Sequence, residues 1–218
     1  MPGLVSLFNG IGGTCAVLIS IVKLNQLSYS LHHTDFAFAE NRVVMYFPVG
    51  EHLIVLMSLI IGSISFAGSM MTWGKLKGSI GDITFKGQRL MNLLLLLIIL
   101  FTAYIFFTRS FIQFLFIPIL ILSLLYGVLF VLPIGGSDVP VVISLLNSFT
   151  GVATVCGGFL YDNKAMLIGG ILVGATGTLL AILMWKSMKR SLKNVMIGSL
   201  GGGSLVASAG SAGKEQGA

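Results

Sequence analysis

The stretch at residues 135–151 reads GGSDVPVVISLLNSFTG and decides how the rest of the chain is interpreted. It places an acid, Asp138, directly before an apolar segment that predicts a helix over residues 139–160. Ser144, Asn147 and Gly151 recur along this helix at steps of three and four residues, so they share one face. A helix with one polar face avoids lipid on that side and needs a polar interior. In a membrane protein, such an interior is typical of a transport path.

The rest of the chain is apolar enough to lie in a membrane. Hydrophobic residues make up 56% of the 218 residues and charged residues 9%, whereas soluble domains carry about 25% charged residues. We therefore expect an all-α integral membrane protein, a bundle of six transmembrane helices joined by short loops. The six segments long enough to cross a bilayer are Leu4–Leu24, His52–Gly74, Leu90–Thr108, Phe111–Leu132, Val139–Leu160 and Ala165–Trp185.

Composition also sets the domain organisation and excludes several function classes. Residues 198–218 are mostly Gly, Ser and Ala, which predicts a linker or flexible C-terminal tail after a transmembrane domain over 1–197. Cys15 and Cys156 lie inside apolar segments, so neither predicts a disulfide, and no Cys/His cluster predicts a metal site. The basic residues behind the net charge of +6 gather at helix ends, which predicts membrane topology rather than nucleic-acid binding.

Two clusters of basic residues predict the orientation. They follow the second and the sixth segment and hold eight of the 13 basic residues: Lys75, Lys77, Lys86, Arg89, Lys186, Lys189, Arg190 and Lys193. Four crossings separate the clusters, so both face the same side, which the positive-inside rule assigns to the cytoplasm. Asp138 and the C-terminal tail are then cytoplasmic as well, and the link over 25–50 is external.

The six segments differ in where their small and polar residues fall. The third and fourth segments are apolar almost throughout, so we expect them to face lipid. The other four carry Gly, Ala, Ser or Thr at steps of three and four residues, as in Ser58, Gly62, Ser65, Ser69 and Thr72. Small residues at this spacing allow close helix packing. The sequence therefore predicts four inner helices in tight contact.

Two asparagines and two edge residues are candidate functional groups. Asn9 and Asn147 lie within spans, where a carboxamide needs a partner. Each either joins two helices by a hydrogen bond or lines a hydrated path together with Ser144. Glu51 and His52, at the predicted outer mouth of the second span, are either a proton entry site or an interfacial anchor. No ionisable residue lies at the middle of any span.

Several motifs, in order along the chain, resemble the β subunit of the proton-translocating NAD(P) transhydrogenase. The residues that carry the resemblance run from Met1 to about Gly198. They are MP and LV within 1–5, FAGS over 66–69, GKL over 74–76, GGSDVPVVISLLNS over 135–148, LVGATG over 172–177 and KSMKRSL over 186–192. Each motif alone is weak, and together they are specific.

The resemblance implies a function. The family couples hydride transfer from NADH to NADP to proton movement, with an NAD site on the α subunit and an NADP site in a C-terminal Rossmann-like domain of β. Asp138, Asn147 and Arg190 match positions that matter for proton translocation or for coupling to the NADP domain. Asn9 falls where many members carry a histidine central to the proton path. The resemblance therefore leaves open which group takes the proton here.

The chain also departs from the family's full length. A whole β subunit has further spans before the Met-Pro motif and an NADP-binding domain after the linker. We therefore expect this chain to be the core of the membrane domain, to bind neither NAD nor NADP itself, and to be inactive alone. The implied partners are an α subunit, an NADP-binding domain and lipid of the inner membrane, in a dimer of the assembled enzyme. The alternatives are an independent transporter or channel and a non-conducting assembly subunit.

Overall fold

Six α-helices build the described part of the chain. The computed structural model describes residues 2–34, 49–81, 87–108, 115–135 and 138–187. Within these ranges there are six helices and no strand: α1 (Pro2–Thr34), α2 (Val49–Leu76), α3 (Gln88–Thr108), α4 (Phe116–Val131), α5 (Val139–Leu160) and α6 (Lys164–Ser187). The predicted all-α bundle is confirmed. Residues 111–114 of the predicted fourth segment and the predicted tail over 198–218 lie outside the described ranges.

The helices differ in length. By length and composition, α1, α2, α5 and α6 are each able to cross a membrane. The apolar parts of α3 and α4, Leu90–Phe106 and Phe116–Val131, are shorter. At 1.5 Å per residue, α4 spans about 24 Å, somewhat less than the roughly 30 Å hydrocarbon core of a bilayer.

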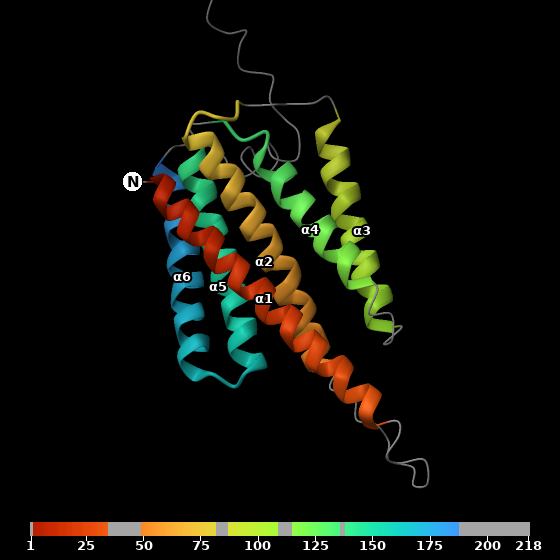
Figure 1. The fold of residues 1–218 in the computed structure, drawn as a ribbon. Coiled ribbons are helices and arrows are strands. Elements are labelled where there is room, and N and C mark those ends of the chain that lie inside the picture. The colour runs from red at the N-terminus through yellow and green to blue at the C-terminus, as the bar shows by residue number, and fades with distance from the viewer. Residues whose placement is uncertain (1, 35–48, 82–86, 109–114, 136–137, 188–218) are drawn as a thin grey trace, which may run out of the picture.

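Successive helices run in opposite directions, so the connections alternate between the two ends of the bundle (Figure 1). At one end, which we call the Asp138 end, α1 begins, α2, α4 and α6 finish, and α3 and α5 start. Lys75 at the end of α2 donates hydrogen bonds to backbone carbonyls just after α4. Ser144 near the start of α5 lies 3.8 Å from the sulfur of Met184 near the end of α6. At the other end, Lys23 of α1 reaches Glu51 of α2.

The centre of the bundle is α2, which packs against α1, α4 and α5. Beyond α4 lies α3, the outermost helix on that side. On the opposite side, α6 packs mainly on α5, and Gly170 and Gly177 are its buried residues. The sequence predicted α6 among four inner helices, but it is peripheral. Its glycines face one partner, and its large apolar side chains remain exposed to the surroundings.

Glycines set the closest helix contacts. A Cβ atom on Gly151 of α5 would overlap the backbone of Gly174 on α6 and lie 2.9 Å from the carbonyl oxygen of Gly170. Likewise, a Cβ on Gly13 of α1 would lie 2.9 Å from the carbonyl oxygen of Gly62 on α2. The backbones meet directly at both crossings, as the small-residue spacing predicted.

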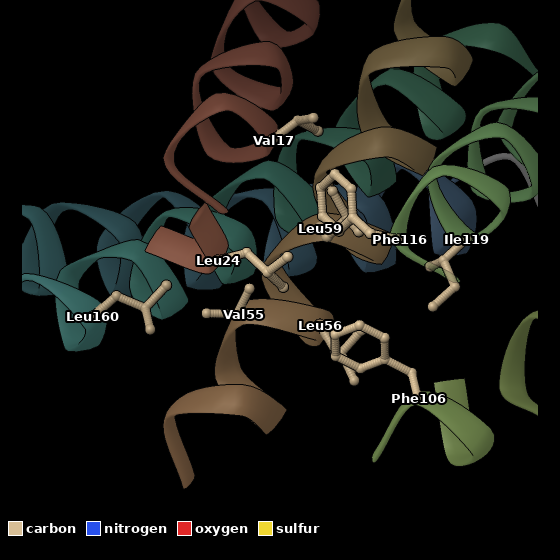
Figure 2. Packing of buried hydrophobic residues seen from close by; sticks show 9 residues of the cluster. All are labelled: Val17, Leu24, Val55, Leu56, Leu59, Phe106, Phe116, Ile119 and Leu160. Atoms are coloured by element: carbon tan, nitrogen blue, oxygen red, sulfur yellow. The ribbon is translucent and has the colours of Figure 1, made fainter. Parts of the chain in front are cut away.

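A smaller apolar core of Phe130, Val131, Ile134, Val142 and Leu146 lies toward the Asp138 end, and the larger one, drawn in Figure 2, lies in the other half of the bundle. We call the larger one the apolar cluster. It joins five helices through Val17, Leu24, Val55, Leu56, Leu59, Phe106, Phe116, Ile119 and Leu160. Leu59, Val55 and Ile119 are fully buried within it. Burying side chains of this size contributes about 1.5–3 kcal/mol each in water. In a membrane, the cluster contributes through close packing instead, because lipid is as apolar as leucine.

Pro133 explains why α4 ends where it does. The carbonyl of Leu129 would accept a hydrogen bond from residue 133 if the helix continued, but proline has no N–H to donate. Side chains of α3 take its place: Gln88 Nε2 and Asn92 Nδ2 lie 3.4 Å and 3.3 Å from the Leu129 oxygen. These contacts fix α3 to the end of α4.

Candidate functional site: a buried polar cluster

Polar side chains from three helices meet in the half of the bundle nearer the Asp138 end. We call this group, Ser6 and Asn9 of α1, Ser65 and Ser69 of α2, and Thr150 of α5, the buried polar cluster. Asn9 Nδ2 donates to Ser69 Oγ over 2.9 Å, and Ser6 Oγ donates to the Ser69 carbonyl over 2.7 Å. Ser65 and Ser69 are fully buried, and Asn9 is only 6% exposed. Asn9 therefore joins α1 to α2, as one of the two readings of the sequence predicted.

The cluster continues from α2 to α5. The hydroxyl oxygens of Ser65 and Thr150 are hydrogen-bonded to each other, and Ser65 Oγ also lies 3.0 Å from the Leu146 carbonyl. Thr150 Oγ1 lies 3.4 Å from the backbone oxygen of Asn9. Hydroxyl groups act as both donors and acceptors. The cluster thus holds two hydrogen-bonded pairs with exchangeable protons, Asn9–Ser69 between α1 and α2 and Ser65–Thr150 between α2 and α5.

One acceptor in the cluster is unsatisfied. Within the part of the chain that the structure describes, Asn9 Oδ1 is buried and accepts no hydrogen bond. Leaving a buried polar atom unpaired costs about 1–3 kcal/mol. A water molecule that donates to this oxygen removes that cost, since buried waters typically serve such groups. The Asn9 carboxamide therefore has both an anchored donor end and an oxygen suited to water.

Asn147 lies beside the cluster rather than in it. It is half-buried on α5, and none of the hydrogen bonds that join the cluster involves its side chain. At 100° per residue, Asn147 projects between Thr150, which faces α1 and α2, and Gly151, which faces α6. Asn147 thus stands at the edge between the two contact faces of α5.

The rest of the predicted polar face of α5 packs against α6. Ser144 bonds its own helix at the Pro140 carbonyl and approaches Met184. Ser148 Oγ donates to the Gly174 carbonyl over 3.0 Å and pairs with the Thr178 hydroxyl at 2.8 Å. The structure therefore places Ser144 in a helix–helix contact. Ser148 and Thr150 were not predicted as site residues, because the predicted polar face of α5 ran through Asn147 to Gly151.

Asp138 stands at the N-cap of α5 and is partly exposed. Its side chain makes no capping hydrogen bond to the helix, while its backbone N–H bonds the Gly135 carbonyl over 2.9 Å. At 1.5 Å per residue, Asp138 lies about 18 Å along α5 from Thr150. Thr150 therefore lies near the middle of α5, whereas Asn9 lies only about 10 Å along α1 from the start of that helix at the Asp138 end. Arg190, its predicted companion, lies outside the described residues.

The predicted entry pair lies at the opposite end. Lys23 Nζ of α1 is 3.6 Å from Glu51 Oε2 of α2, and the same ammonium lies 5.8 Å from the centre of the Tyr161 ring after α5. His52 is partly buried beside Glu51. Between this end and the buried polar cluster stands the apolar cluster. Glu51 and His52 are therefore separated from Asn9 by packed aliphatic and aromatic side chains.

Comparison with known proteins identifies the family. A family model described as "NAD(P) transhydrogenase beta subunit" matches residues 1–218. Two curated proteins named NAD(P) transhydrogenase subunit beta, from Rhodospirillum rubrum and from its strain ATCC 11170, are each 35% identical to the chain over 216 residues. The alignments cover 97% of this chain and 44% of each relative. The chain spans less than half the length of these relatives.

Proposed function

Because the chain belongs to the NAD(P) transhydrogenase beta subunit family, we propose that it is the membrane part of such a subunit. In this proposal it passes protons across the membrane and couples them to hydride transfer between NADH and NADP. The observation that carries the proposal is the buried polar cluster, where Asn9 bonds Ser69 and keeps an unsatisfied oxygen. Asn147 and Asp138 lie on the helix that contributes Thr150 to the cluster.

The proposed proton route uses water and the cluster's hydroxyls. A proton delivered at the Asp138 end moves along α5 past Asn147 and reaches the Asn9–Ser69 pair. Asn9, Ser69 and Thr150 each offer an oxygen, and a hydroxyl can accept one proton while donating another. None of these groups titrates near neutral pH, so in this proposal the protein orders the water and a titratable group on a partner carries the charge.

The proposed partners and cofactors follow from the family. NAD and NADP bind in the whole enzyme, on an α subunit and on an NADP-binding domain, and neither binds this chain. The domain docks at the Asp138 end, where Asp138 and Arg190 respond to its state. We also propose that the complete enzyme is a dimer in the inner membrane. The exposed apolar side chains of α1, α3 and α6 suit contact with lipid or with such partners.

Proton uptake during the reaction tests the proposal. The chain is assembled with an α subunit and an NADP-binding domain in vesicles, and uptake is followed while NADPH reduces an NAD analogue. Asn147→Leu removes the carboxamide between the two faces of α5 and is expected to abolish coupled uptake. Asn25→Leu makes the same chemical change at an exposed position of α1 and should leave uptake intact. Normal uptake by the Asn147→Leu enzyme would remove Asn147 from the route.

The role of Asp138 has its own test in the same vesicles. Asp138→Asn removes the charge and keeps the shape of the side chain. Coupled uptake is expected to fall, because the proposed docking end loses its acid. If the Asn variant matches the wild type, Asp138 is only an acidic residue near the start of a helix, where a negative charge is generally favourable.

Labelling of single cysteines tests the proposed orientation. In a chain with Cys15 and Cys156 replaced by alanine, Asn163→Cys and Ser187→Cys place a thiol at opposite ends of α6. In intact cells, an impermeant thiol reagent should label the cysteine at 163 and not the one at 187. The opposite pattern would reverse the proposed cytoplasmic position of Asp138 and of the C-terminus.

A further inference from the structure

A lysine ties the end of α2 to the link that carries Asp138. Lys75 Nζ donates to the carbonyl oxygens of Leu132 and Ile134, over 2.6 Å and 2.8 Å. The side chain is partly buried. Hydrogen bonds from an ammonium are stronger than those between neutral groups. Both hydrogen bonds are short and share one donor nitrogen, so the side chain holds the link at two of its residues.

The link needs this anchor because its own backbone leaves carbonyls open. α4 ends at Val131 and is followed by Pro133, and the carbonyls that Lys75 reaches, those of Leu132 and Ile134, come just after its last turn. These carbonyls lie at the negative end of the helix dipole, where a cation is favourable. Past Ile134, the Gly135 carbonyl accepts the backbone N–H of Asp138. The anchored carbonyls are therefore only a few residues from the acid.

The end of α2, which carries Lys75, is held by a regular C-terminal cap. α2 finishes with the Gly78 N–H bonded to the Lys75 carbonyl and the Ser79 N–H bonded to the Gly74 carbonyl. This is the Schellman pattern, and Gly78 supplies the positive φ of 76° that it requires. Ser69, which receives the hydrogen bond from Asn9, lies on the same helix about 9 Å along the axis from Lys75. One rigid helix thus carries both the anchor and a member of the buried polar cluster.

We propose that Lys75 is a positioning residue that fixes Asp138 relative to α2, so that a change at the docking end is transmitted along α2 to Ser69 and Asn9. The proposal rests on the proposed function for its consequence and on the two hydrogen bonds for its structure. When the docked domain displaces the link that carries Asp138, the two hydrogen bonds displace Lys75 and hence α2. Without the ammonium, the link moves independently of the buried polar cluster.

The chain offers a matched control two residues away. Lys77 carries the same charge in the same segment, but it is exposed and its Nζ lies 5.1 Å from the centre of the Trp73 ring. Lys77→Met therefore makes the same change in charge and shape as Lys75→Met while leaving the contacts to Leu132 and Ile134 intact. A difference between the two variants reports on the anchor rather than on the net charge.

Hydrogen exchange on the chain alone, in lipid nanodiscs, tests the anchor without any partner. In Lys75→Met, the hydrogen-bonded backbone amides of Ile134 and Asp138 should exchange at least tenfold faster than in the wild type, whereas Lys77→Met should match the wild type. Lys75→Arg should restore slow exchange, because a guanidinium also donates to carbonyls. If Lys75→Met does not fold, Lys75→Ala, which likewise has no donor, reports on the same contact. Unchanged exchange in whichever of these two variants is measured would overturn the anchor.

The number of protons taken up per NADPH oxidised, measured in the assembled enzyme, tests the transmission. Lys75→Met should lower this ratio, Lys77→Met should keep it, and Lys75→Arg should recover most of it. A normal ratio in Lys75→Met together with a lowered ratio in Asp138→Asn would overturn the positioning role. A normal ratio in Asp138→Asn refutes the proposed role of Asp138, and with it the transmission, while the exchange result still decides whether the anchor exists.

Discussion

The two halves of the bundle bury different chemistry. Near the Asp138 end, α1, α2 and α5 meet through Asn9, Ser69, Ser65 and Thr150. In the other half, the same three helices meet α3 and α4 through aliphatic and aromatic side chains such as Leu59. Packing alone would be served by apolar residues throughout. Hydrogen bonds between polar side chains of different helices are concentrated toward the Asp138 end, whereas the buried serines of the other half, Ser20 and Ser58, bond backbone carbonyls.

The difference teaches where water can enter. The hydroxyls and the open oxygen of Asn9 suit ordered water, whereas a dry cluster of leucine, valine and phenylalanine excludes it. Ser20 in the apolar half bonds a carbonyl of its own helix, and Ser58 bonds carbonyls of α1 and α5. Under the proposed function, the polar half exchanges protons with the Asp138 end, and the apolar half is the barrier that a proton must pass to reach the other side.

The largest expected effect comes from making the polar half apolar. Asn9→Leu removes the donor to Ser69 and the open oxygen together, so coupled proton uptake by the assembled enzyme should fall to background. Asn9→His keeps a hydrogen-bonding side chain at the position that the family resemblance associates with histidine, and it should retain uptake. Equal uptake by the Leu and His variants would show that the carboxamide has no part in the route.

An intermediate effect is expected from opening the apolar half. Leu59 is fully buried in the apolar cluster, and large-to-small changes at such sites cost about 2–5 kcal/mol. Leu59→Ala should therefore lower the midpoint of thermal unfolding in detergent. The protons taken up per NADPH oxidised, normalised to folded enzyme, should stay near the wild-type value unless the new cavity fills with water. A ratio lowered as far as in Asn9→Leu would erase the proposed difference between the halves.

The smallest effect belongs to the ion pair at the far end. Lys23 and Glu51 are 3.6 Å apart near the surface of the bundle, and exposed pairs contribute about 0–1 kcal/mol. Lys23→Met should change the free energy of unfolding by no more than this amount, and by less at high salt. If the variant also abolished coupled uptake, the far end would take part in conduction, as expected if Glu51 is a proton entry group.

Sequence patterns predicted the helices well because each apolar run is long and bounded by charged or turn residues. They also singled out Asn9 and Asn147, because a carboxamide within an apolar span needs a hydrogen-bonding partner. They could not identify Ser69 as the partner of Asn9. Ser69 is on another helix, and its position relative to Asn9 depends on the Gly13–Gly62 crossing.

Two features of the site were missed for physical reasons. Thr150 lies at the edge of the polar face of α5, one turn from Leu146. The predicted face ran through Gly151 and therefore did not include Thr150. The sequence did not reveal that α6 is peripheral. The same glycine spacing occurs in a helix that packs against one helix and in a helix that packs against several. Only the packed structure shows that Gly170 and Gly177 both face α5.

The comparison between Thr150 and Thr154 tests the central claim most directly. Thr150 Oγ1 bridges helices through Ser65 and Asn9, whereas Thr154 Oγ1 bonds a carbonyl of its own helix over 2.8 Å. Valine removes each hydroxyl with little change of shape. The measurement is the number of protons taken up per NADPH oxidised in vesicles. Thr150→Val should lower this ratio and Thr154→Val should keep it; a wild-type ratio in Thr150→Val would contradict a proton route through the buried polar cluster.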